Sequence, residues 1–319
     1  MNSKIIIVGG DPNSVNSEII YKTWKKLNSK IKEKVYFIGS YNLFKSQFKK
    51  LNYNLKLFKI QNIQEKNNKF KIIDIPLNFK NPFKVNNKSA SKYVLKSLNK
   101  AHVLTNRKVF KGLINCPIDK KLLSKSKNIG VTEYLASKCQ IKNNSEVMII
   151  YNKKLSVVPI TTHIQLKNVP NRINKKLIIK KVMTLSKEFK AHFKKRPKIA
   201  VLGLNPHNDE FSINSEEYKE IIPAINTLKK KGININGPFS SDSFFINNYK
   251  NFNVLVGMYH DQVLTPFKTL FQFDAINITL GLNYIRLSPD HGPALNLIGK
   301  KSASSLSLLR CIQFINKRN

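Results

Sequence analysis

Short apolar runs alternate along the chain with longer segments in which apolar residues recur at helical spacing. The runs at residues 4–8 and 112–116 end at glycine or proline, as strands commonly do where the chain turns. We predict further strands at 35–38, 147–151 paired with 155–160, 199–204, 254–258 and 276–280, and helices at 17–27, 89–101, 175–189, 216–230 and 303–315. This alternation predicts an α/β fold with a largely parallel sheet.

The length and composition fit a globular chain of about two domains. The chain has 319 residues, of which 41% are hydrophobic, so it can bury a sizeable core. No stretch approaches the roughly 18 consecutive apolar residues that a membrane-spanning helix needs. Cys116, Cys139 and Cys311 are widely separated and odd in number, which favours a reducing cytoplasm over a disulfide framework or a paired-cysteine zinc site.

The formal net charge of +38 raises the question of a nucleic-acid partner. Six of the 56 basic residues are arginine, the residue better suited to bidentate phosphate and base contacts. The lysines are scattered among asparagine and isoleucine, all of which A/T-rich codons favour. We therefore favour a composition bias on solvated surfaces over nucleic-acid binding, and the charge would still attract an anionic substrate.

Three histidines follow predicted strands: His163, His207 and His260. Ligands of open α/β sheets bind beyond the carboxyl ends of the strands. Three imidazoles with an open coordination position are typical of a catalytic zinc site. Each histidine alone is more commonly a structural loop residue, but their shared placement makes a metal site a hypothesis to test.

Candidate anion-binding groups lie nearby in the sequence. Lys268 and Arg286 are cations close to predicted strands, although either could be an ordinary surface cation in so basic a chain. Thr132 begins a predicted helix, where it could cap the helix or bind a phosphate, and the cap is the simpler interpretation. The chain contains no G-x-G-x-x-G, no P-loop and no G-x-S-x-G motif.

Several motifs together carry a family resemblance. TTHIQLKNV (161–169), GLNPHNDE (203–210), MYHDQVLTPFK (258–268) and INITLGLNYIRLSPDHGPA (276–294) follow one another in order. The chain resembles the 4-hydroxythreonine-4-phosphate dehydrogenase family of pyridoxal phosphate biosynthesis over nearly its whole length. The resemblance implies a two-domain fold like isocitrate and isopropylmalate dehydrogenases, which bind NAD(P) without a Rossmann fingerprint. It also implies a homodimer whose active site lies in the interdomain cleft at the subunit interface.

The resemblance also implies domains, site residues and a reaction. The expected domains are 1–128 with 288–319, and 129–287. The enzyme would oxidise 4-phosphohydroxy-L-threonine with NAD or NADP as the hydride acceptor, and it would need one divalent metal ion (zinc, magnesium or cobalt). The metal ligands would be His163, His207 and His260, the third from the partner subunit; the substrate contacts would be Thr132, Lys268, Asn277 and Arg286; and the acidic candidates for proton transfer would be Asp242 and Asp261.

The chain departs from the family pattern at three places. Val131 replaces a histidine that contacts substrate, Pro293 replaces a threonine, and the loop 10–18 lacks two glycines and a proline. We favour drift under base-composition pressure. A sister dehydrogenase of another four-carbon acid 4-phosphate, and a non-catalytic basic protein that binds nucleic acid, remain as alternatives.

Overall fold

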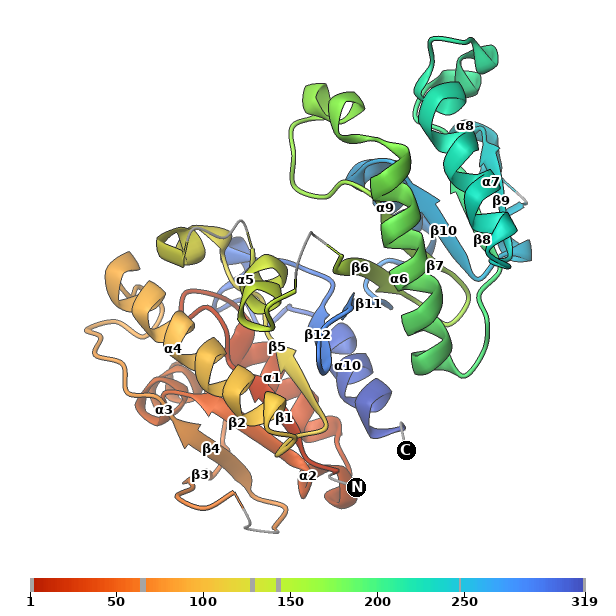
Figure 1. The fold of residues 1–319 in the computed structure, drawn as a ribbon. Helices are drawn as coiled ribbons and strands as arrows, with labels where there is room; N and C mark the ends of the chain where they lie inside the picture. The colour runs from red at the N-terminus through yellow and green to blue at the C-terminus, as the bar shows by residue number, and fades with distance from the viewer. Residues whose placement is uncertain (1–2, 64–66, 127–129, 142–144, 247, 318–319) are drawn as a thin grey trace. The chain divides into compact units, whose positions relative to one another are not determined.

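The chain folds into two units, each built around its own part of a β-sheet (Figure 1). The computed structural model describes residues 3–63, 67–126, 130–141, 145–246 and 248–317. Unit 1 comprises Met1–Gln140, Phe273–Ile276 and Leu282–Asn319, and unit 2 comprises Ile141–Gln272 and Asn277–Gly281. The expected α/β class is confirmed.

The division differs from the sequence-based boundaries, 1–128 with 288–319 against 129–287, in the place of two elements. Helix α5 (Val131–Lys138) belongs to unit 1, because Tyr134 and Leu135 are buried in the core cluster of that unit. Strand β12 (Ile285–Pro289) also belongs to unit 1, because it pairs in parallel with a strand of its sheet.

Unit 1 contains six strands in the order β3-β4-β2-β1-β5-β12, and every pairing among them is parallel. Central strand β1 is buried at all four residues, as a strand covered on both faces should be. Helix α4 packs on one face, and α1 and α10 lie on the other (Figure 1). The strands are β1 (Ile5–Val8), β2 (Val35–Gly39), β3 (Leu57–Lys59), β4 (Phe70–Asp74), β5 (Gly112–Asn115) and β12; the helices are α1 (Asn16–Lys26), α2 (Ser29–Lys32), α3 (Tyr41–Lys50), α4 (Asn87–Asn106), α5 and α10 (Leu306–Asn316).

Unit 2 contains the strand order β11-β6-β7-β10-β8-β9. The predicted pair β6 and β7 is confirmed as antiparallel, with Ile150 opposite Val157, whereas β7, β10, β8 and β9 are mutually parallel. The strands are β6 (Val147–Tyr151), β7 (Ser156–Pro159), β8 (Ile199–Leu202), β9 (Ile235–Phe239), β10 (Val254–Gly257) and β11 (Ile276–Leu280); the helices are α6 (Lys175–Phe193), α7 (Ile222–Lys230), α8 (Ser241–Phe244) and α9 (His260–Phe271).

Short helical turns complete the two units. A π-helical turn at Glu217–Ile221 leads directly into α7. The 3₁₀ turns are Lys120–Ser126, Leu166–Asn168, Pro170–Arg172, Pro206–Phe211, Asn248–Asn251 and Leu295–Leu297. Within the described ranges, no helix is both long and apolar enough to cross a membrane.

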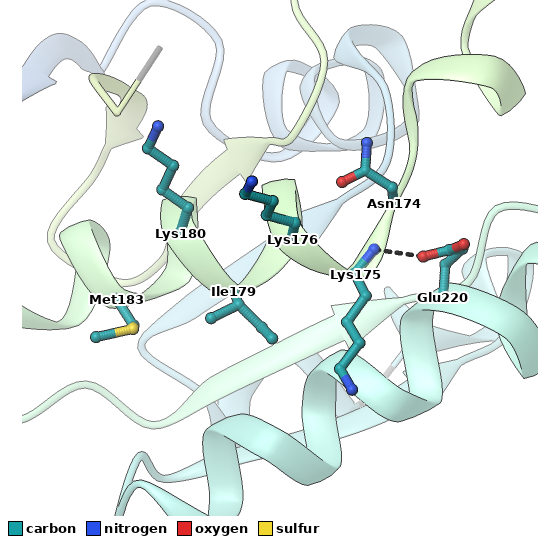
Figure 2. A pocket seen from close by; sticks show the side chains of 7 residues that line it. All are labelled: Asn174, Lys175, Lys176, Ile179, Lys180, Met183 and Glu220. Atoms are coloured by element: carbon teal, nitrogen blue, oxygen red, sulfur yellow. Dashed lines mark hydrogen bonds between the residues drawn. The ribbon is translucent and has the colours of Figure 1, made fainter. Parts of the chain in front are cut away.

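A hollow lies along the first turns of α6, and its lining includes Lys175, Lys176 and Glu220 (Figure 2). The backbone amide of Lys175 donates to the Glu220 carboxylate at 2.5 Å. The residues that line this hollow include none of the predicted site residues, so it is separate from the candidate site.

Candidate functional site

The four parallel strands of unit 2 end at one edge of the sheet, and the predicted histidines follow three of them. His163 follows β7 and His260 begins α9 after β10. Their ring centroids lie 5.8 Å apart, with 40° between the ring planes. The fold therefore brings two of the three predicted metal ligands together.

A carboxylate orients the second of these rings. Nδ1 of His260 lies 2.6 Å from Oδ1 of Asp261. An imidazole whose Nδ1 donates to a carboxylate presents its other nitrogen to a metal, and the carboxylate makes that nitrogen more basic. Asp261 is thus in contact with a candidate ligand and is placed to orient it.

His207 follows β8 in a turn of unusual backbone conformation. Residues 207–211 all have positive φ angles between 45° and 59°. The approach to the turn is held by Glu217, which is fully buried and accepts hydrogen bonds from the amides of Leu204 (2.6 Å) and Asn205 (2.8 Å). The His207 side chain is exposed.

Asp242 lies at the start of α8, beyond β9, and is exposed. The amide of Ser243 donates to its Oδ1 at 2.8 Å, and this hydrogen bond lowers the pKa of the Asp242 carboxyl. The Asp242 carboxylate is therefore ionised at neutral pH.

The donor set suits a divalent transition metal, because imidazole is its commonest protein ligand. Within one chain His163 and His260 lie close together, whereas the resemblance assigns the third ligand, His260, to the site of the partner subunit. No group of three histidine, cysteine, aspartate or glutamate residues within the described part of this single chain is arranged to hold an ion. The set of three ligands, one of them from a partner subunit, stays a prediction.

Unit 1 holds a buried cation, Arg286, near the start of strand β12. Arg286 is 3% exposed; its Nε donates to Oδ1 of Asn115 at 2.8 Å, and its Nη1 donates to the Thr132 hydroxyl at 3.2 Å. Burial lowers the pKa of Arg286 to about 10, and the negative charge of Glu133 opposes this shift. The guanidinium therefore remains charged at neutral pH and is held in one orientation.

Thr132 contacts Arg286 from the first turn of helix α5. The simpler interpretation, that Thr132 caps the helix, is wrong, because Gly130 is the N-cap residue. The hydroxyl of Thr132 instead accepts from the guanidinium. Thr132 and Arg286, two predicted substrate contacts that are far apart in sequence, are thus adjacent.

The remaining two predicted substrate contacts lie in unit 2. Lys268 is half-buried in the last turn of α9, and Asn277 lies near the start of β11. The amide oxygen of Asn277 is buried and accepts no hydrogen bond from the described residues. An oxygen in that state suits a ligand that donates a hydrogen bond.

Three residues of the site were not predicted from the sequence: Asn115, Glu217 and Gln262. Each is a buried polar side chain with a partner in another element: Asn115 accepts from Arg286, 171 residues away, Gln262 donates to Gly203, 59 residues away, and Glu217 accepts from Asn205, 12 residues away. Only Gln262 had a local signal, because it follows directly on His260-Asp261 in a helix that is otherwise apolar on its buried side.

Comparisons with known proteins place the chain in a family. The family model described as pyridoxal phosphate biosynthetic protein PdxA matches residues 30–315. Proteins named 4-hydroxythreonine-4-phosphate dehydrogenase from Sulfurihydrogenibium and Aquifex aeolicus are each 39% identical, covering 97% and 99% of this chain and 96% and 98% of their own lengths. The crystal structure of 4-hydroxythreonine-4-phosphate dehydrogenase from Klebsiella pneumoniae superposes with a TM-score of 0.84 at 27% identity, covering 100% of this chain and 99% of that one. The chain belongs to the PdxA family of pyridoxal phosphate biosynthetic proteins.

Proposed function

We propose that the protein oxidises 4-phosphohydroxy-L-threonine with NAD or NADP as hydride acceptor and a divalent metal ion, in pyridoxal phosphate biosynthesis. The product, 2-amino-3-oxo-4-phosphooxybutanoate, is a β-keto acid that loses carbon dioxide to give 3-amino-2-oxopropyl phosphate. The observation that carries the proposal is the His163–His260 pair at the strand ends of a chain whose full-length relatives bear this dehydrogenase name.

Residues of unit 1 are suited to bind an anionic group of the substrate. Arg286 carries a permanent charge, and its orientation is fixed by Asn115 and Thr132. A fixed, partly desolvated guanidinium binds phosphate or carboxylate more strongly and with more directional specificity than a mobile surface lysine. Lys268 and Asn277 are the other two substrate contacts that the family resemblance implies.

Residues of unit 2 are suited to hold the metal and move a proton. His163 and His260, with His207, would hold the ion, which acts as a Lewis acid on the hydroxyl that is oxidised. Asp242 is the better proton acceptor of the two carboxylates, because Asp261 is engaged with His260. The carboxylate would take the proton of that hydroxyl, and NAD or NADP, when bound, would supply the hydride acceptor for the same carbon.

The proposed assembly is a cytoplasmic homodimer in which one subunit completes the ligand set of the other. This arrangement would explain why three ligands are not arranged together within the described part of one chain. We propose no nucleic-acid partner.

The direct test is formation of reduced nicotinamide by the purified, metal-supplemented protein with 4-phosphohydroxy-L-threonine. We expect turnover that a chelator abolishes and added metal restores. A folded, metal-loaded protein that leaves this substrate unchanged would contradict the proposal.

A second candidate, a sister dehydrogenase of another four-carbon acid 4-phosphate, rests on one observation. Val131 stands next to Thr132 at the start of α5, where the family has a histidine that contacts substrate. A panel of such phosphorylated acids separates the two, because the preferred substrate has the highest kcat/KM.

The ligand role of His207 is tested by His207→Ala. The side chain is exposed, so the fold should survive, while bound metal falls and turnover drops by more than about a hundredfold. Metal content, thermal midpoint and kcat are measured together. His192→Ala on α6 is the matched control and should leave all three unchanged. Turnover within a few-fold of wild type for His207→Ala would remove this residue from the ligand set.

A further inference from the structure

Gln262 makes three hydrogen bonds to different segments of unit 2. It is 9% exposed and is the third residue of α9. Its Oε1 accepts from the amide of Met258 at 2.6 Å, and its Nε2 donates to the carbonyl of Gly203 at 2.6 Å and to the hydroxyl of Ser241 at 2.7 Å. The side-chain amide therefore uses its one acceptor group and both of its N–H donors.

The three partners share a position in the fold. Each lies just beyond the carboxyl end of a parallel strand, and a predicted site residue follows within four positions. The partner and site residue are Met258 and His260 after β10, Gly203 and His207 after β8, and Ser241 and Asp242 after β9.

These bonds connect the strands where the sheet no longer does. The pairing of β10 with β8 ends at Val256 and Val201, and the register between β8 and β9 is irregular between Ala200 and Leu202. One backbone bond still joins the ends of β8 and β9, because the Gly203 amide donates to the Phe239 carbonyl at 3.0 Å, but no strand pairing fixes the loops after β10 and β8 relative to each other. The Gln262 amide supplies that constraint.

The network extends to the fourth loop through Met258. While the Met258 amide donates to Gln262, its carbonyl accepts from the hydroxyl of Thr161 at 2.7 Å and from the Thr161 amide at 3.1 Å. Thr161 lies two residues before His163. One connected set of hydrogen bonds thus joins the loops of all three histidines and of Asp242.

We propose that Gln262 is a positioning residue that holds, within each subunit, the loops of His207, His260 and Asp242 in place for that subunit's contribution to the metal site. The inference rests on the proposed function for the identity of the ligands. Catalytic and metal-binding groups must be held to within about 0.5 Å, and side chains locked by neighbouring hydrogen bonds provide this. Only an amide meets the requirement here, because a carboxylate at neutral pH cannot donate to the Gly203 carbonyl and an apolar side chain leaves buried backbone groups without partners.

The test compares Gln262→Glu with Gln47→Glu. Gln47 is also a buried glutamine, and its Nε2 donates to the carbonyls of Pro12 (2.8 Å) and Pro82 (2.7 Å) in unit 1. Both variants lose buried amide donors and should lower the thermal midpoint. Only Gln262→Glu should weaken Zn²⁺ binding, by at least about tenfold, measured by competition with a chromogenic chelator.

Two further readouts separate positioning from general destabilisation. Amide hydrogen exchange in residues 203–211 should accelerate in Gln262→Glu and not in Gln47→Glu. Thr161→Val, which loses only the side-chain bond to Met258, should weaken Zn²⁺ binding by a few-fold while remaining folded, so the proposal stays testable if Gln262→Glu does not fold.

Unchanged Zn²⁺ affinity in folded Gln262→Glu or Thr161→Val, or equal weakening in Gln47→Glu, would overturn the proposal. The probe is the metal ion alone, so the result does not depend on the substrate. A wild-type protein that binds Zn²⁺ but does not oxidise 4-phosphohydroxy-L-threonine would contradict the proposed function and leave the role of Gln262 standing.

Discussion

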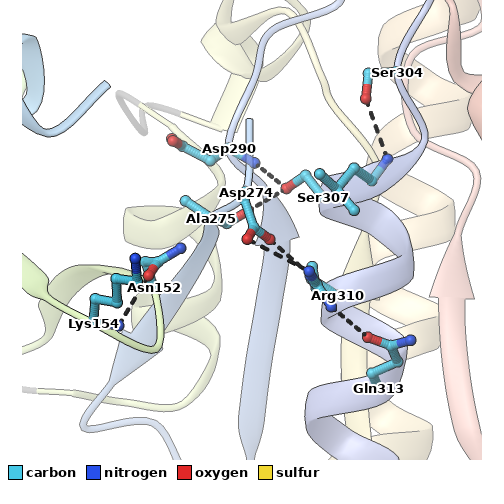
Figure 3. Close-up of polar contacts among 10 residues, drawn as sticks. Asn152, Lys154, Asp274, Ala275, Asp290, Ser304, Ser307, Arg310 and Gln313 are labelled. Atoms are coloured by element: carbon cyan, nitrogen blue, oxygen red, sulfur yellow. Dashed lines mark hydrogen bonds and ion pairs between the residues drawn. The ribbon is translucent and has the colours of Figure 1, made fainter. Parts of the chain in front are cut away.

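Arg286 binds its two neighbours in a geometry that only a guanidinium provides. In Arg286→Lys the charge remains, but a single ammonium cannot hold both Asn115 and Thr132 and still face a substrate anion. We expect KM for the phosphorylated substrate to rise about tenfold or more, with Zn²⁺ affinity unchanged. Arg310→Lys is the control, because Arg310 pairs with Asp274 at 2.7 Å (Figure 3) and has no proposed role. An unchanged KM in Arg286→Lys would argue against the anion site.

His102 provides a residue-scale test of pH dependence. Burial lowers the pKa of His102 from its ordinary value of 6.5, and the charge of Lys138 acts in the same direction; its Nδ1 lies 3.0 Å from the Tyr284 hydroxyl. Below pH 6.5 the His102 side chain binds a proton more readily in the unfolded chain than in the folded protein. The free energy of unfolding is therefore unaffected by this group above pH 6.5 and decreases as the pH falls below it. In His102→Gln the thermal midpoint should fall less steeply than in wild type between about pH 7 and pH 5. Parallel curves for the two proteins would contradict this.

At the residue scale, the sequence patterns predicted where candidate residues lie in the fold better than which residues they bind by hydrogen bonds. The histidines could be placed because each follows a recognisable strand. Asn115 could not, because nothing near it in sequence indicates that a guanidinium 171 residues away will need an acceptor. Long-range hydrogen bonds depend on which strands become neighbours, and local patterns do not contain that information.

At the scale of elements, helix α6 depends on a side-chain cap. Oδ1 of Asn174 accepts from the amide of Leu177 at 2.9 Å. Asn174→Ala should reduce the free energy of unfolding by about 1 kcal/mol, measured by denaturant titration. Asn171→Ala, in the turn before the helix, should have little effect. Equal losses in both variants would mean that the cap contributes nothing specific.

Three of the elements that the sequence pattern missed, β9, β3 and α9, have recognisable physical reasons. Strand β9 contains Gly237-Pro238, a pair that argues against a central strand. The pair is tolerated because β9 is an edge strand of the sheet and its pairing with β8 is irregular. Strand β3 is the last strand on the other side and is only half-buried. Helix α9 begins at His260 itself and contains Pro266, so it resembles a loop. Edge strands and interrupted helices carry weak periodicity.

At the scale of the whole molecule, the charge of +38 should act on substrate capture. A strongly positive protein concentrates anions near its surface, and salt screens this over about 10 Å at 0.1 M ionic strength. We expect kcat/KM for the phosphorylated substrate to fall as sodium chloride rises from about 0.01 M to about 0.3 M. Sucrose at matched osmolality is the control. A kcat/KM independent of salt would show that the charge does not assist binding.

The α/β class followed from the alternation of strands and helices, and the two-part division from length and family resemblance. The boundary could not be placed, because α5 carries no feature in its own sequence that selects one core over the other. Its assignment to unit 1 depends on Leu135 reaching a cluster that includes Leu113 and Leu123. Side-chain packing in the folded protein therefore decides which unit α5 joins.

The discontinuous composition of unit 1 has a consequence for synthesis on the ribosome. Strand β5 pairs on one side with β1, but its other partner, β12, is translated only after all of unit 2. At 5–20 residues per second, roughly 10–40 s separate residue 140 from the end of α10. During that interval the nascent chain carries an open edge of β5, and unpaired strand edges recruit other chains. We therefore expect the nascent chain to be most prone to aggregation, and to benefit most from a chaperone, before its last forty or so residues leave the ribosome.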